Sequence, residues 1–366
     1  MKISTILGAL MLLSGSAFVA GEEPSTITIT NLTIADEEGL LVCFNGGTGK
    51  LGKCRTEFDG ITVNCDLGES INMALGAKAT AAAYLQVLVS GTCNENLWLQ
   101  RAYKTLLIGT DTGATIVGQS AGTATVGVGG SRVGLTNLTI INGESGPGVF
   151  VAPSGLLELR ESVIQSSAGP ALAVAAGTAL ITDGNTITAT GAAFPAIMAR
   201  EGAGVWVGNN NTISSAADAP NTDMTTINGT RGVVITLFGD GNQVTNTTGE
   251  RALDLKQGST FRQQNGHAVF NGRVSVYHMS NADFRDVEIN GDVDVTLFGS
   301  LLLRDENSDG VATDTVIGTT TIGHLSNLEV RGTNVGLNGD LVCVGLVPGT
   351  VTGDPPLISG SDSCTP

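Results

Sequence analysis

The sequence predicts an all-β protein whose main domain is a right-handed parallel β-helix, a stack of short strand-and-turn coils. Two observations support this fold class: short apolar motifs recur at a nearly constant period, and the composition suits short strands between tight turns. Of the 366 residues, 51 are glycine, 4% are aromatic and 41% are hydrophobic, mostly Val, Ile, Leu and Ala. Small β-branched residues favour strands, and glycines favour sharp corners. The hydrophobic fraction is large enough to form a core, which excludes a disordered chain.

The period is visible in two independent columns. Strand motifs of the type Asn-Leu-Thr-Ile end, at similar intervals, at Ile140, Ile164, Ile187 and Ile213. A proline precedes an apolar strand, in phase with the first column, at Pro147, Pro170 and Pro195. Equivalent strands of successive coils would then stack about 4.8 Å apart and enclose one apolar core. A β-sandwich also has short strands between turns, but it does not predict this period.

The second half of the chain repeats as well. The motif Ile-Thr-Leu-Phe-Gly at 235–239 returns as Val-Thr-Leu-Phe-Gly at 295–299. We interpret this interval as three coils that are shorter than those of the first half, at roughly 20 residues each. Asparagines that recur at corners are candidates for ladders of stacked side-chain amides. These asparagines are Asn185, Asn210, Asn211 and Asn242.

Both ends of the chain carry their own signals. Lys2, an apolar run over 6–13 and small residues after it predict a signal peptide at 1–21. The protein is therefore expected to be exported, and to be extracellular, periplasmic or at the cell surface. No other stretch approaches the length of a transmembrane helix. Residues 22–64 form an N-terminal segment with a short Cys loop, which is either a separate module or an oligomerisation arm.

The β-helix domain is expected over 65–340. A helix at 69–83, with Ser70 as its N-cap, is expected to cover the N-terminal end of the core, and the first coil strand should begin near residue 85. Residues 341–366, which contain Pro348, Pro355 and Pro356, should form an irregular C-terminal cap.

An even number of cysteines in an exported chain predicts disulfides. Four of the six lie before residue 94 and two lie after residue 340, so we favour sequential pairing at the two ends of the stack. No Cys-x-x-Cys motif and no histidine near a cysteine supports a metal site instead. The six are Cys43, Cys54, Cys65, Cys93, Cys343 and Cys364.

Several segments resemble the opening coils of bacterial secreted right-handed β-helix repeat proteins, which belong to the pectin-lyase-like fold. They are Val87–Leu99 (VLVSGTCNENLWL), Leu106–Ile116, Ser131–Ile140 and, before them, Val63–Ile71. The resemblance covers 63 to about 340 and implies the fold. That fold hosts lyases, hydrolases, esterases, epimerases, adhesins and phage spikes, so the resemblance does not select a function.

The catalytic motifs of enzymes with this fold are not found in the sequence. Gly266-His267-Ala268 lacks the second glycine of the hydrolase Gly-His-Gly motif, and the acidic pairs and Arg-Ile-Lys motif of those hydrolases do not occur. The calcium-binding, Trp-Asp-His and Asp-Pro motifs of pectate lyases and epimerases are missing from the coils. With 18 Lys and Arg against 34 Asp and Glu, the net charge is −16, which argues against nucleic acid as a partner.

One group of residues remains as a catalytic candidate. A β-elimination on an acidic sugar needs cations to neutralise the carboxylate and a base to remove a proton. Arg251, Lys256 and His267 provide these groups, and Arg231 and Arg273 are spaced to extend Arg251 into a column. The alternative interpretation is that all are ordinary outward-facing residues.

The segment Asp-Glu-Asn-Ser-Asp-Gly at 305–310 resembles the first half of a calcium loop. Its candidate ligands are Asp305, Asn307, Asp309 and Asp314. A full EF-hand loop would have Glu at position 316, where this chain has Val316, so a calcium ion would have a structural role.

We therefore expect an exported, non-enzymatic module that binds a polysaccharide or cell-surface glycan or has a structural role. The alternative is a polysaccharide lyase that acts on a uronic-acid polymer. Trp98 and Trp206 could stack on sugars or simply pack.

Overall fold

The computed structural model describes residues 33–35, 41–45, 50–53, 59–77, 84–100, 104–110, 114–218, 225–304, 315–332, 335–345, 349–354 and 356–364. The chain divides into two compact units, Met1–Glu57 and Phe58–Pro366. The first contains a small antiparallel sheet of β1 (Thr33–Ala35), β2 (Leu41–Asn45) and β3 (Lys50–Lys53). The expected signal peptide at 1–21 lies outside the described residues and stays a prediction.

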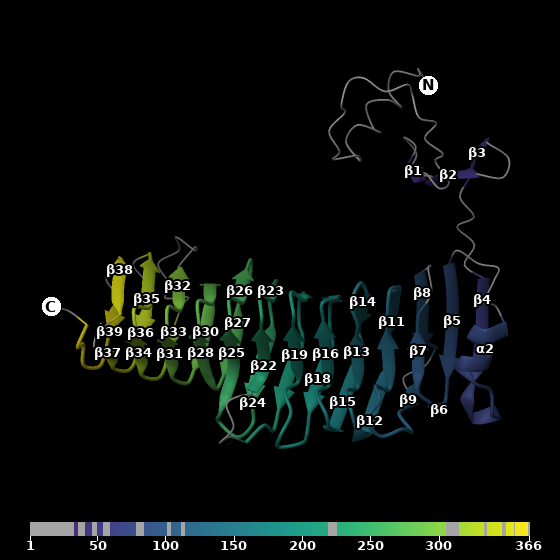
Figure 1. The fold of residues 1–366 in the computed structure, drawn as a ribbon, viewed down its shortest axis with the longest axis horizontal. Coiled ribbons are helices and arrows are strands. Elements are labelled where there is room, and N and C mark those ends of the chain that lie inside the picture. The colour runs from purple at the N-terminus through teal and green to yellow at the C-terminus, as the bar shows by residue number, and fades with distance from the viewer. Residues whose placement is uncertain are drawn as a thin grey trace. The chain divides into compact units, whose positions relative to one another are not determined.

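The second unit is a parallel β-helix of about 11 turns, which confirms the predicted fold class. Three long sheets run side by side along the stack (Figure 1). From β5 to β37, each coil contributes one strand to each of them in the order sheet 1, sheet 2, sheet 3. All pairs within these sheets are parallel, so each coil hydrogen-bonds to the coils before and after it. In the part of the chain that the structure describes, no helix is long and apolar enough to cross a membrane.

Sheet 1 consists of β4 (Asp59–Asn64), β5 (Tyr84–Ser90), β8 (Lys104–Gly109), β11 (Arg132–Thr136), β14 (Leu156–Arg160), β17 (Thr178–Ile181), β20 (Gly204–Val207), β23 (Val234–Phe238), β26 (Thr260–Gln264), β29 (Asn281–Arg285), β32 (Ser300–Arg304), β35 (Asn327–Arg331) and β38 (Thr350–Gly353). Sheet 2 consists of β6 (Thr92–Asn94), β9 (Thr115–Val117), β12 (Thr139–Ser145), β15 (Val163–Ala168), β18 (Thr186–Ala189), β21 (Thr212–Ser215), β24 (Asn242–Asn246), β27 (Ala268–Asn271), β30 (Val287–Asn290), β33 (Thr315–Val316), β36 (Gly336–Leu337) and β39 (Leu357–Ile358). Sheet 3 consists of β7 (Leu97–Leu99), β10 (Val126–Val128), β13 (Val149–Val151), β16 (Leu172–Ala175), β19 (Ile197–Arg200), β22 (Thr225–Thr230), β25 (Arg251–Lys256), β28 (Arg273–Tyr277), β31 (Val293–Thr296), β34 (Thr320–Gly323) and β37 (Leu341–Val344).

The parallel strands extend beyond the limits that we expected. β4 already belongs to sheet 1 and pairs with β5 from Asp59↔Leu85 to Asn64↔Ser90, so the first strand is not the one near residue 85. At the other end, β37, β38 and β39 continue all three sheets into the segment expected to be irregular. Leu341 and Leu357 supply apolar residues at the start of two of these strands, and Pro356 falls between strands, where it disrupts no pairing.

The helix α2 (Ile71–Ala77) lies between β4 and β5, after a short 3-10 helix at Cys65–Leu67. Ile71 and Leu75 are buried in the core, and the hydroxyl of Ser70 accepts a hydrogen bond from the Met73 amide, as the N-cap assignment predicts. The helix was expected to run over 69–83, but 78–83 are not among the described residues. Its role as a cap over the core stays a prediction.

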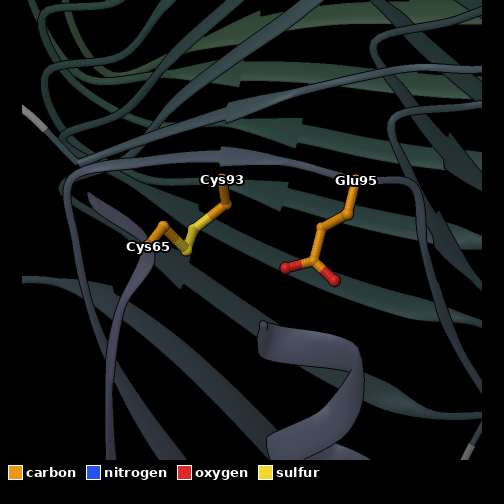
Figure 2. A group of neighbouring side chains, drawn as sticks. All are labelled: Cys65, Cys93 and Glu95. Atoms are coloured by element: carbon orange, nitrogen blue, oxygen red, sulfur yellow. A yellow bond between two sulfur atoms is a disulfide. The ribbon is translucent and has the colours of Figure 1, made fainter. Parts of the chain in front are cut away.

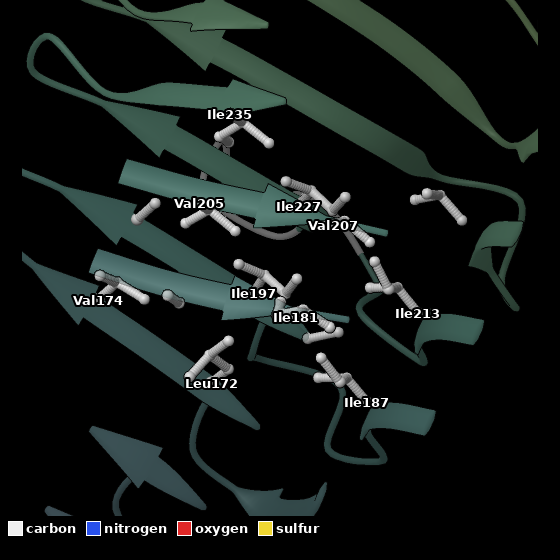
Figure 3. Close-up of a cluster of buried hydrophobic side chains, with 14 of the residues drawn as sticks. Leu172, Val174, Ile181, Ile187, Ile197, Val205, Val207, Ile213, Ile227 and Ile235 are labelled. Carbon is white, nitrogen blue, oxygen red and sulfur yellow. The ribbon is translucent and has the colours of Figure 1, made fainter. Parts of the chain in front are cut away.

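Inward-facing residues of all three sheets form one continuous core. Its middle is aliphatic, with Val, Ile and Leu side chains of successive coils in contact (Figure 3). Further along, Phe261, Phe270 and Phe284 form an aromatic cluster with ring centroids 5.1 to 5.7 Å apart. The alternation of buried and outward residues along each strand produces this arrangement.

Three of the four predicted corner asparagines form a buried ladder. The side-chain oxygen of Asn211 accepts hydrogen bonds from the backbone and side-chain amides of Asn185, both at 2.9 Å. Asn242 accepts from Asn211 in the same way, at 3.1 and 3.3 Å. Asn210 does not join the ladder, because it occupies the left-handed corner position beside it, with φ 55°.

Two of the three expected disulfides are present. Cys65 bonds to Cys93 near the start of the stack, and Cys343 bonds to Cys364 at its end. The pairing of Cys43 with Cys54 stays a prediction, since Cys54 lies outside the described residues.

The expectation of uniformly shorter coils in the second half is wrong. Ile235 lies on sheet 1 and Val295 on sheet 3, so the two similar motifs are not equivalent positions. In sheet 1, the intervals between successive register partners shorten from Ile235 through Phe261 and Ala282 to Leu301, and lengthen again to Leu328. The coils differ in length because their turns contain different numbers of residues, whereas the strands remain in register.

Candidate functional site

The outer face of sheet 3 changes character along the stack. One line of outward positions, each in register with the next, begins with aromatic and apolar residues and continues with polar and charged ones. In chain order it consists of Trp98, Gly127, Phe150, Ala173, Met198, Asn228, Asp254, Ser275 and Asp294. The two halves of this face are two different candidate sites.

The first half contains an aromatic platform, which we define as Trp98, Gly127, Gly129 and Phe150. The six-membered ring of the Trp98 indole covers both glycines: a Cβ on Gly127 would collide with Cε3 and Cζ3 of the ring, and one on Gly129 would lie 3.2 Å from Cζ2. The ring centroids of Phe150 and Trp98 lie 6.4 Å apart, and the two ring planes are inclined by 31° to each other. Trp98 is nevertheless 52% exposed. An indole lying against the sheet in this way leaves one face open to solvent.

The polar edge of the same indole is also held in place. Its Nε1 donates a hydrogen bond of 3.3 Å to Oε1 of Gln100, two positions along the chain. The ring therefore has a defined orientation, with its apolar face outward and its N–H group directed along the surface. Such rigid amphipathic rings contribute strongly to binding because little conformational entropy is lost on contact.

The second half contains a charged cluster, which we define as Arg251, Asp254, Lys256, Arg273, Tyr277 and Asp294. The Asp254 side chain faces outward, as the strand pattern predicted, but is fully buried. Its Oδ2 lies 3.4 Å from Lys256 Nζ and accepts a hydrogen bond of 3.4 Å from the Tyr277 hydroxyl. Lys256 Nζ also lies 5.9 Å from the centre of the Tyr277 ring.

Two arginines stack beside this group. Arg251 and Arg273 are register partners on adjacent coils, as the sequence spacing predicted. Arg273 forms ion pairs with Asp292 at 3.4 Å and Asp294 at 3.6 Å. Arg231 does not extend this column, because it lies in the turn after β22, where it pairs with Glu201 at 3.1 Å.

Burial shifts the pKa of three groups in the charged cluster. It raises the pKa of the Asp254 carboxyl, an effect that the positive charges of Lys256 and Arg251 only partly offset. Burial likewise raises the pKa of Asp294 and of the Tyr277 hydroxyl. Asp254 Oδ1 and Ser275 Oγ are buried and find no hydrogen-bond partner among the described residues. The central carboxylate of the cluster, that of Asp254, is closed to a large substrate because it is fully buried.

The predicted catalytic residues lie on two different sheets, and their joint role stays a prediction. Arg251 and Lys256 are the first and last residues of β25, whereas His267 immediately precedes β27 of sheet 2. There, His267 Nδ1 lies 2.8 Å from Asp286 Oδ1. The residues that the sequence did not reveal are Tyr277, Asp294 and Phe150, and only the register that places them beside Asp254 and Trp98 identifies them.

The candidate calcium ligands Asp305, Asn307, Asp309 and Asp314 lie outside the described residues, so the calcium site stays a prediction. Among the residues that the structure describes, one group has metal-ligand composition: Cys65, Cys93 and Glu95 (Figure 2). Its sulfurs are joined in a disulfide and are not thiolates, which a metal requires.

Glu95 has a structural role instead. Its carboxylate accepts hydrogen bonds from the Ile71 amide at 2.7 Å, the Asn72 amide at 3.0 Å and the Ser70 hydroxyl at 2.9 Å. A negative charge at this position satisfies the free amides of a helix N-terminus and interacts favourably with the helix dipole. Through these hydrogen bonds, Glu95 connects the N-terminus of α2 to the first full coil.

No protein-family model, no curated protein and no solved structure matches this chain. The parallel β-solenoid therefore rests on its own strand pairing, and the resemblance to the pectin-lyase-like fold rests on the sequence segments alone.

Proposed function

We propose that the protein is an exported β-solenoid that binds a polysaccharide along the outer face of sheet 3 without cleaving it. The observation that supports this function is the aromatic platform. The C–H faces of sugar rings pack against aromatic rings, and Trp98 presents a broad, oriented and half-exposed indole for such a contact.

The continuous face beyond the platform suits a chain-like ligand. Phe150 and Met198, which are partly exposed, lie on the same line of register partners as Trp98, so an extended polymer can contact several coils. Repeat proteins commonly use extended surfaces of this kind for binding. The net charge of −16 favours a neutral polymer over a polyuronate, because like charges repel.

The experiment is affinity electrophoresis of the protein in gels containing neutral or acidic polysaccharides. We expect at least one neutral polymer to retard the protein and Trp98→Ala to abolish the retardation. Trp206→Ala is the matched control, because the Trp206 ring lies over Gly204 but on sheet 1. Retardation that persists in Trp98→Ala would show that the platform is not the binding site.

A polysaccharide lyase is the second candidate function. It is favoured by the charged cluster, in which two stacked arginines and Lys256 lie near a carboxylate of raised pKa and a tyrosine. The ultraviolet absorbance that unsaturated sugar ends produce, measured on uronic-acid polymers with and without calcium, tests this function. Product formation that is lost in both Arg273→Ala and Tyr277→Phe would establish the lyase and refute the non-catalytic function.

Export is part of the proposal and has its own test. Sequencing of the mature protein from its N-terminus should show cleavage after Ala17 or Gly21. A mature chain that keeps Met1 would contradict it.

A further inference from the structure

The outer face of sheet 2 is a regular array of side chains. From β6 to β27, each strand of this sheet presents two outward residues that flank one buried residue. Because the strands pair in register, these residues form two columns along the stack, one from Thr92 to Val269 and one from Asn94 to Asn271. We call the two columns together the hydroxyl face. All of its residues are partly or fully exposed to solvent.

The hydroxyl face contains no charged residue. Half of its positions are Thr or Ser, and the others are Val, Ile, Asn or Gln. The first charge in these columns is Glu288, one coil beyond Val269. The chain as a whole has 34 acidic and 18 basic residues, and in the same part of the stack sheet 1 presents Arg132 and Glu158 and sheet 3 presents Arg200. Strand propensity favours threonine, but it does not explain why charge is confined to the other two faces.

The array is most regular at the centre of the stack. Thr186 and Thr188 of β18 are the register partners of Thr212 and Ser214 of β21, and no register shift interrupts this pairing. The hydroxyls of Thr188 and Ser214 lie 3.0 Å apart and share a hydrogen bond. Thr186 and Thr212 are accessible to solvent, so their hydroxyls can bond to water.

The spacing of the hydroxyl face is set by the fold. Successive coils of a parallel β-helix lie about 4.8 Å apart, and residues two positions apart on a strand lie about 6.6 Å apart. The oxygen atoms on the prism faces of ice repeat at two perpendicular spacings close to these. Core residues such as Ile187 and Ile213 hold the strands from the inner side (Figure 3), so little conformational entropy is lost when the face meets a lattice.

We propose that the hydroxyl face binds ice. Threonine hydroxyls can take the place of lattice water, and the methyl groups beside them favour an ordered water layer. A charged side chain keeps its own hydration shell, which does not fit the lattice, and this face carries none. Sugar polymers are bound chiefly through aromatic rings, and no position of the hydroxyl face is aromatic, so ice suits it better than a solid polysaccharide. The site lies on a different sheet from the aromatic platform and is independent of it.

The test combines adsorption to a growing ice surface with thermal hysteresis, the gap between the melting and freezing points of an ice crystal in the protein solution. Wild type should enter the ice and produce hysteresis that increases with concentration. Thr186→Lys and Thr212→Lys should each abolish both effects, because a hydrated ammonium group in the centre of the array keeps the face off the lattice. Equal melting temperatures of the variants and wild type check that the coils are intact.

Thr178→Lys is the matched control, since Thr178 is an outward threonine of the same coil as Thr186 but lies on sheet 1. It should keep the activity of wild type, as should Trp98→Ala, which tests the polysaccharide site alone. A wild type that is excluded from ice and shows no hysteresis overturns the proposal. An equal loss in Thr178→Lys also overturns it, because added charge at any position would then explain the effect. Binding to crystalline cellulose or chitin that is lost in Thr186→Lys, without binding to ice, would assign the face to a solid sugar polymer instead.

Discussion

The indole of Trp98 lies directly over Gly127 of the next coil, and no other residue type could occupy that position without moving the ring. Gly127 has no side chain, and the Trp98 ring occupies the space that a side chain at this position would fill. A β-strand normally disfavours glycine, because glycine has no side chain to pack and loses more entropy on folding. Here its small size lets an aromatic ring lie flat against the sheet.

Gly127→Val should therefore weaken polysaccharide binding although Trp98 is retained. The valine side chain would push the indole off the sheet, and we expect the affinity to fall about tenfold or more. Acrylamide quenching of tryptophan fluorescence should increase at the same time, because the ring becomes more exposed. Gly143→Ala is the control, since a Cβ at that glycine meets no atom of the described residues within 4 Å. Binding of wild-type strength in Gly127→Val would show that the flat orientation is unimportant.

The raised pKa of Asp254 predicts a specific pH dependence of stability. The folded state holds the proton of this carboxyl more tightly than the unfolded state does. Its contribution to stability is therefore fully present below the unfolded-state pKa and is lost as the pH rises through the folded-state pKa.

Denaturant unfolding of wild type and Asp254→Asn across pH should show this loss. As the pH rises from about 4, the free energy of unfolding of the wild type should decrease relative to that of Asp254→Asn. The decrease should be roughly 1.4 kcal/mol for each unit by which the folded-state pKa is raised. Asp340→Asn should differ from wild type with the opposite sign, since a backbone hydrogen bond from Ser361 lowers the pKa of Asp340. A constant difference between wild type and Asp254→Asn would contradict the predicted titration.

Asn211 is the central member of the asparagine ladder and should be important for stability. Asn211→Ala removes the side-chain acceptor for two amides of Asn185 and the side-chain donor to Asn242, whereas the backbone amide of residue 211 still donates to Asn242. All of these groups are buried. Unsatisfied buried groups of this kind cost about 1 to 3 kcal/mol each. We expect a loss of about 2 to 3 kcal/mol in the free energy of unfolding, measured with urea. Asn281→Ala, at an exposed strand position, should change it little, and similar effects for the two variants would argue against the ladder.

The Cys65–Cys93 disulfide should stabilise the N-terminal end of the stack. The bond closes a loop with a sequence separation of 28, and Cys65→Ala/Cys93→Ala should lower stability by about 3 to 4 kcal/mol. Hydrogen exchange should accelerate in β5 and α2 but not in β25 or β28, because a solenoid transmits stability mainly between neighbouring coils. Cys343→Ala/Cys364→Ala should accelerate exchange at the opposite end. Uniform acceleration in either variant would contradict local stabilisation.

The sequence alone determined the class of fold and much of its repeat. Inward residues such as Ile140 and Ile164 recur because every coil must bury the same face, and local alternation makes that pattern visible in one dimension. The buried asparagine ladder was predictable for the same reason: equivalent corners recur once per coil. The prediction from sequence was wrong where a local motif does not show which position of the coil its residues occupy. Ile235 and Val295 share a motif but belong to different sheets, since turns of variable length shift the phase.

Only the tertiary structure decided which outward residues meet. Trp98 and Phe150 are far apart in the sequence, as are Asp254 and Tyr277, but the parallel register places each pair on one face. The same register places Lys256 on sheet 3 and His267 just before a strand of sheet 2. Outward positions are not required to be apolar, unlike the inward ones. The residue types at outward positions therefore do not indicate which of them lie next to each other on the surface. The aromatic platform and the charged cluster exist because stacking converts distant positions into neighbours.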